Sequence, residues 1–80
     1  MMSDWVLGQN GLEKTFDFSS FKEAIGFVVM VSAVAERANH HLEILINYTS
    51  VKLTLFTHSA KAVTEKDHTL AKEIDQLFLT

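Results

Sequence analysis

The sequence contains no cysteine, so neither a disulfide framework nor a thiolate metal site can hold the fold together. It also lacks proline, while 48% of its 80 residues are hydrophobic. A chain of this length forms one domain, here residues 1–80, and buries only about 60% of its unfolded surface. We therefore expect burial against further copies of the chain, in a homodimer or homotetramer, to supplement a thin core.

Positive charge is scarce as well, since the formal net charge is −3 and the chain has a single arginine. Nucleic-acid binding depends on clustered lysine and arginine, so a nucleic-acid partner is excluded. The apolar run over residues 24–35 is shorter than the roughly 20 residues of a membrane-spanning helix, and charged residues flank it. It has neither the n-region nor the cleavage site of a signal peptide, so we do not expect it to be one. We expect a cytoplasmic protein with no membrane partner.

Glycine is rare, and one of the three glycines follows Asn10. Asn-Gly is a strong hairpin signal, because both residues tolerate the positive φ of a type I′ turn. We expect Asn10 and Gly11 at the tip of a hairpin between strands over residues 5–7 and 12–18. That register places Trp5 opposite Phe16.

A helix and a second hairpin follow. Ser20 and Glu23 form a capping-box pattern, which predicts a helix from there to about residue 38. Residues 43–48 and 51–57 are rich in β-formers and predict two strands with residues 49–50 at the tip. In that register Ile46 faces Leu53.

A last helix begins within residues 64–67, where acidic residues favour a helix N-terminus. The element order is therefore β-β-α-β-β-α. It predicts an α+β two-layer sandwich, in which a four-stranded antiparallel sheet carries the helices on one face.

Histidine is the chemically informative residue of this chain. His40 and His41 are adjacent, and the expected register of the second hairpin places His41 opposite His58 with Cβ atoms about 5 Å apart. Imidazole exchanges protons near neutral pH, so three converging histidines indicate acid–base chemistry. A zinc ion held by the three histidines and a water molecule is the alternative.

An ordered set of residues surrounds these histidines and carries a family resemblance. It comprises Glu36, Asn39, His40, His41, Tyr48, Thr57, His58, Thr64 and Asp67. With this set the chain resembles the pterin-4a-carbinolamine dehydratase family over nearly its whole length.

The resemblance implies dehydration of 4a-hydroxytetrahydropterin to quinonoid dihydropterin, which recycles the tetrahydrobiopterin-type cofactor of aromatic amino-acid hydroxylases. It implies a pterin substrate and neither a metal nor an organic cofactor. His40 and His58 match the main acid–base histidines, and His41 matches a third. A second group matches positions that line or orient the pterin site: Glu36, Asn39, Thr57 and Asp67.

The chemistry suits these residue types, because the departing hydroxide needs an acid and a ring N–H proton needs a base. Such assistance contributes about 10²–10⁴-fold. We hypothesise that the Glu36 carboxylate fixes the tautomer of one imidazole or keeps it protonated.

Two departures from the family pattern favour an alternative function. Leu42 stands where proline is usual, and residues 60–63, which include Lys61 and Ala62, replace a segment usually rich in glycine. A non-glycine residue with positive φ in that segment would cost about 1 kcal/mol. The alternative is a catalytically weak paralogue that serves as a protein-binding dimerisation cofactor of a transcription factor.

Overall fold

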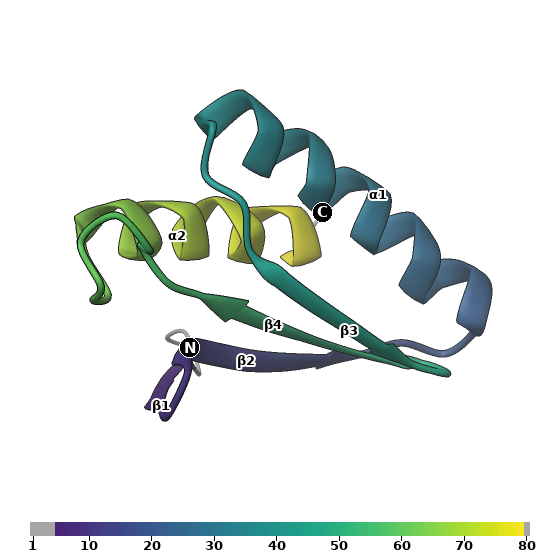
Figure 1. Cartoon of the computed structure of the whole chain (residues 1–80). Helices are drawn as coiled ribbons and strands as arrows, with labels where there is room; N and C mark the ends of the chain where they lie inside the picture. The colour runs from purple at the N-terminus through teal and green to yellow at the C-terminus, as the bar shows by residue number, and fades with distance from the viewer. Residues whose placement is uncertain (1–4, 80) are drawn as a thin grey trace.

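The computed structural model describes residues 5–79, which fold into two layers (Figure 1). The elements are β1 (Val6–Gly8), β2 (Gly11–Asp17), α1 (Phe21–Ala38), β3 (Glu43–Asn47), β4 (Ser50–Leu55) and α2 (Glu65–Leu79). The four strands form one antiparallel sheet in the order β1-β2-β4-β3. Both helices cover the same face of the sheet (Figure 1), so the predicted fold class and element order are confirmed.

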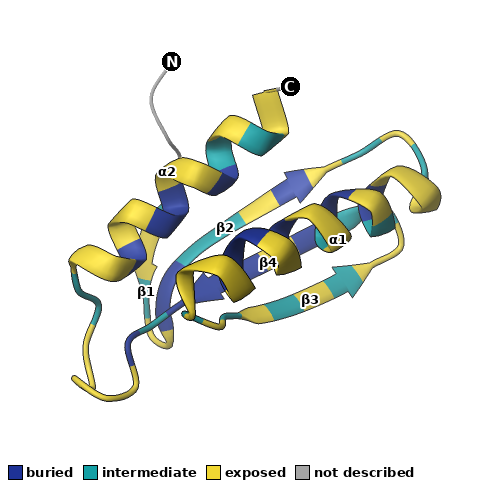
Figure 2. Ribbon diagram, turned by 90° about the horizontal axis from the view of Figure 1, so that it is seen from above, coloured by how far each residue is buried: buried dark blue, intermediate teal, exposed yellow. Residues whose placement is uncertain are grey.

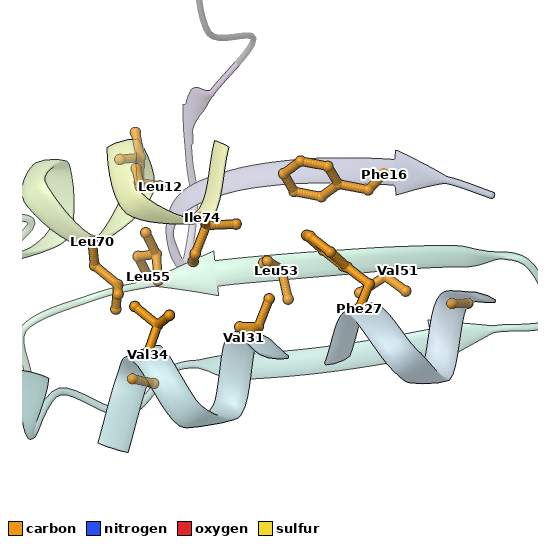
Figure 3. Close-up of a cluster of buried hydrophobic side chains, with 13 residues drawn as sticks. Leu12, Phe16, Phe27, Val31, Val34, Val51, Leu53, Leu55, Leu70 and Ile74 are labelled. Carbon is orange, nitrogen blue, oxygen red and sulfur yellow. The ribbon is translucent and has the colours of Figure 1, made fainter. Parts of the chain in front are cut away.

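The core fills the space between the sheet and the two helices (Figure 3). Alternate residues of β4, namely Val51, Leu53 and Leu55, are fully buried. They face the helices, because side chains alternate between the two faces of a strand. Exposed residues follow the outer sides of both helices (Figure 2). Among residues 5–79, neither helix combines the length and apolar sequence needed to cross a bilayer.

Helix α1 begins and ends through identifiable caps. The Ser20 hydroxyl accepts a hydrogen bond from the Glu23 backbone N–H at 3.1 Å, as the capping box predicts, while the Glu23 carboxylate binds Ser19. At the other end Asn39 adopts the left-handed conformation with φ 53°, and its N–H binds the carbonyls of Ala35 and Glu36. This cap ends α1 directly before His40.

The register predicted for the first hairpin is wrong by two residues. Leu7 pairs with Leu12, so Gln9 and Asn10 occupy the turn, and Gly11 is the first residue of β2. Gly11 has φ 138°, and a Cβ atom there would lie 2.3 Å from the Leu55 carbonyl oxygen. Close approach to β4 therefore explains the glycine, and the type I′ turn does not form.

The second hairpin is also shifted by two residues from its predicted register. Ile46 pairs with Val51 and Ile44 with Leu53, and Tyr48, at the tip, has φ 58°. The Phe18 backbone N–H donates to the Thr49 carbonyl at 2.9 Å. This hydrogen bond joins the turn to the segment between β2 and α1. A shift of two keeps every side chain on its predicted face of the sheet.

Candidate active site

Two dipeptides supply the side chains that the sequence singled out. His40-His41 lies between α1 and β3, and Thr57-His58 follows β4. In each pair the first side chain binds Asp67 on α2, and the second lines a cavity together with residues of the sheet's outer face. The two side chains of each pair therefore lie in different surroundings.

The first side chains belong to a hydrogen-bonded network around Asp67, which we call the Asp67 network: His40, Thr57, Thr64 and Asp67. His40 Nε2 lies 2.6 Å from Asp67 Oδ1. The Thr57 hydroxyl donates to Asp67 Oδ2 at 2.7 Å, and the Thr64 backbone N–H donates to the same oxygen at 2.9 Å. The two threonine oxygens lie 2.7 Å apart, so the Thr64 hydroxyl donates to Thr57.

Asp67 is fully buried, and the groups around it determine whether its carboxyl group is ionised. Burial alone would raise the pKa of Asp67, but the hydrogen bonds from His40, Thr64 and Thr57 outweigh it and hold the pKa below its usual value. An ionised carboxylate only accepts hydrogen bonds, so Nε2 of His40 must carry a proton. The Nδ1 atom of His40 is therefore the ring nitrogen left to exchange a proton.

The second side chains share a cavity of about 540 Å³, which we call the histidine cavity. Its lining comprises Gln9, Asn10, His41, Leu42, Glu43, Thr54, Phe56 and His58. The Phe56 and His58 rings meet edge to face, with centroids 5.1 Å apart. His41 Nε2 lies 3.3 Å from Glu36 Oε1, and these side chains are 75% and 80% exposed. The Glu36 contact that we hypothesised exists, but it is long and open to water.

The expectation that three imidazoles share one pocket is correct for two of them only. His40 turns to Asp67 and lines a separate cavity of about 310 Å³ beside α2. His41 and His58 are not cross-strand partners either, because the β3–β4 ladder ends at Glu43 and Thr54. Within residues 5–79, no three His, Asp or Glu side chains gather to hold a metal ion, so the zinc alternative lacks its ligand set.

The other residues suggested by the resemblance occupy three different settings. Thr57 and Asp67 are buried and orient His40 rather than face the histidine cavity. Glu36 contacts His41. Asn39 caps α1 and lines neither the histidine cavity nor the cavity beside His40.

Sequence reasoning missed several residues of the site. The observed registers of the two hairpins bring three further residues into the lining of the histidine cavity: Asn10, Glu43 and Thr54. Nothing in their local sequence signals this position. Thr64 already belongs to the ordered set that carries the family resemblance, and its spacing to Asp67 is that of a capping box, with the Thr64 N–H donating to the Asp67 carboxylate.

The loop that carries Thr57 and His58 is closed on itself. Thr57 and Ala62 exchange backbone hydrogen bonds of 3.1 and 3.3 Å. Lys61 has φ 54°, so one position of the segment that is usually rich in glycine adopts the left-handed conformation. A lysine there carries the strain of about 1 kcal/mol that the sequence led us to consider.

Comparison with known proteins identifies the family of this chain. The family profile described as "Pterin 4 alpha carbinolamine dehydratase" matches residues 1–77. A relative from Sulfurisphaera tokodaii that carries the family's name is 45% identical over 95% of this chain and 82% of its own length. One from Chloroflexus aurantiacus (strain J-10-fl) is 46% identical over 92% of this chain and 80% of its own.

Two solved structures share the fold. A transcriptional coactivator/pterin dehydratase from Brucella melitensis superposes with a TM-score of 0.82 at 34% identity, over 92% of this chain and 79% of that one. A pterin dehydratase-like protein identified as a RuBisCO assembly factor of the alpha-carboxysome has a TM-score of 0.78 at 26% identity, over 94% and 89% of the two chains. Sequence and structure together show that this chain belongs to the pterin-4-alpha-carbinolamine dehydratase family of hydro-lyases.

Proposed function

We propose that this protein dehydrates a 4a-hydroxytetrahydropterin to the quinonoid dihydropterin, with histidines as general acid and base. The observation that carries the proposal is the shared cavity of His41 and His58, two exposed imidazoles in a hollow of about 540 Å³. That volume lies in the ordinary range of small-molecule sites. Phe56 supplies an apolar wall suited to a flat bicyclic ring.

The reaction needs one proton delivered and one removed. The C4a–O bond breaks as a protonated imidazole gives its proton to the oxygen, which leaves as water. A neutral imidazole takes the N–H proton of the pterin ring, whose remaining electron pair forms the new double bond. Histidine performs either half near neutral pH, and each half is worth about 10²–10⁴-fold.

His40 is the third histidine of the proposed mechanism, and its side chain lies in different surroundings from that of His41. Asp67 occupies its Nε2 atom, so Nδ1 is the atom left to exchange a proton, and the proposed exchange runs through a bridging water because His40 does not line the histidine cavity. A carboxylate that orients an imidazole in this way fixes its tautomer. We assign Thr57 and Asp67 to the positioning of His40, and Glu36 to His41.

The test is to generate the carbinolamine with a hydroxylase and to follow its disappearance with and without this protein. We expect faster disappearance, lost in His58→Ala and retained in His68→Ala. His68 is exposed on α2 and lines neither the histidine cavity nor the cavity beside His40, so it is the matched control. Equal activity of wild type and His58→Ala would overturn the proposal.

A binding role is the second candidate, because the two structural neighbours are described as a coactivator and an assembly factor. Helix α1 exposes three apolar side chains, Phe21, Val29 and Met30, which would suit contact with another protein. We propose that further copies of this chain cover them, in a dimer or tetramer. A stable monomer in light scattering at micromolar concentration would contradict this.

A further inference from the structure

The histidine cavity continues onto the outer face of the sheet. A groove of about 310 Å³ there shares three residues with the histidine cavity, namely Asn10, Glu43 and Thr54. We call these three residues the junction. Thr54 on β4 pairs with Glu43 on β3 and, on its other side, with Glu13 on β2. Anything that extends from the histidine cavity into the groove passes this row of the sheet.

The junction carries negative charge and lacks a free cation. Glu43 is its ionisable residue, and it is exposed. The groove contains one lysine, Lys52, and that side chain lies 3.6 Å from the Glu13 carboxylate. Among residues 5–79, no cation lies within ion-pair distance of Glu43. Glu13, Glu43 and Lys52 together leave one negative charge in excess.

We propose that the side chain of the pterin substrate leaves the histidine cavity through this junction, and that Glu43 discriminates against side chains that carry phosphate or carboxylate. The inference rests on the proposed function and adds a specificity residue to it. An anionic group near Glu43 would meet an unpaired like charge, with only a neutralised lysine close by. Hydroxyl groups would instead donate to the Glu43 carboxylate and exchange hydrogen bonds with Asn10 and Thr54.

The sharpest probe is a pair of pterins that differ in charge alone. Neopterin and neopterin 3′-monophosphate share the ring and a hydroxylated three-carbon side chain, and the second adds a phosphate. The dissociation constant of each is measured by equilibrium dialysis at low salt. We expect the phosphate to weaken binding to the wild-type protein.

Substitution of Glu43 gives the decisive comparison. The measured ratio is the dissociation constant of neopterin 3′-monophosphate divided by that of neopterin. In Glu43→Gln this ratio should fall by about threefold to tenfold, as expected for one screened charge a few ångströms away. Glu43→Lys should lower it further. The ratio should also fall in high salt for the wild type, because screening weakens an electrostatic penalty.

Asp17→Asn is the matched control. Asp17 lies on the same face of the sheet but lines neither hollow, and it accepts a hydrogen bond from Ser50 at 2.6 Å that an asparagine oxygen can also accept. The ratio should stay at its wild-type value in this variant. An equal change in Asp17→Asn would show a general charge effect and overturn the assignment to Glu43.

The remaining outcomes separate this inference from the function on which it rests. If carbinolamine is turned over but Glu43→Gln leaves the ratio unchanged, the dehydratase assignment stands and the role of Glu43 is wrong. If the wild-type protein neither binds nor turns over any pterin, the proposed function fails and the inference with it.

Discussion

The Asp67 network and the histidine cavity draw on the same two dipeptides, yet they differ in burial and in the length of their histidine–carboxylate contacts. In the network, Asp67 is 0% and His40 12% exposed, and their atoms lie 2.6 Å apart. At the edge of the cavity, His41 is 75% exposed and lies 3.3 Å from Glu36, which is 80% exposed and does not line the cavity. Among residues 5–79 there are therefore two histidine–carboxylate pairs, one buried and short, the other open and long.

The difference indicates a division of labour. A buried, charge-assisted hydrogen bond is strong and leaves its side chains little freedom, whereas an exposed pair contributes about 0–1 kcal/mol. His40 and Thr57 thus fix the backbone at both dipeptides through Asp67. Their neighbours His41 and His58 stay exposed to meet a substrate. Stability should depend on the network, and turnover on the cavity.

The largest expected effect is that of His58→Ala on turnover. Removal of one acid–base imidazole should lower kcat/KM by about 10²–10⁴-fold. The free energy of unfolding should fall by less than about 1 kcal/mol, because the ring is exposed and loses one edge-to-face contact with Phe56. Carbinolamine kinetics and urea unfolding measure the two quantities, and a large stability loss would erase the contrast between the two regions.

Asp67→Asn should reverse that pattern and act first on stability. The change removes the charge that three hydrogen-bond donors share, so the free energy of unfolding should fall by about 2–3 kcal/mol. A double-mutant cycle with Thr57→Val should show coupling of at least about 0.5 kcal/mol. Urea unfolding provides all four values. Strict additivity would mean that the Asp67 network does not act as a unit.

The pH dependence of the same variant sharpens the comparison. The pKa of Asp67 is depressed in the folded state below the reference value of 3.8. Its contribution to stability is therefore complete above that value and is lost as the pH falls through the lower, folded pKa. The stability gap between wild type and Asp67→Asn should therefore shrink as the pH falls below 3.8. A gap that persists unchanged at the lowest pH would show that the charge of Asp67 is not its source.

Local features of the fold could be predicted from the sequence better than features that depend on distant contacts. Caps and the order of elements follow from local patterns, which is why the Ser20–Glu23 cap and the β-β-α-β-β-α order were predicted correctly. Turn positions depend on distant contacts, such as that of Gly11 with Leu55. The errors of two residues preserved every face of the sheet, whereas the separation of His40 from the histidine cavity depends on its contact with Asp67, which is distant in the sequence.

Glu36→Gln should have the smallest effect. The pair with His41 is exposed and long, so its loss should lower kcat/KM by about twofold, and high salt should abolish the difference from wild type. Steady-state kinetics at two salt concentrations measure this difference. Glu23→Gln is unsuitable as a control, because the Glu23 carboxylate caps α1. A loss of tenfold or more that resists salt would show that bound substrate closes the Glu36–His41 pair. The open cavity would then acquire, during turnover, the short and shielded geometry that the Asp67 network holds permanently.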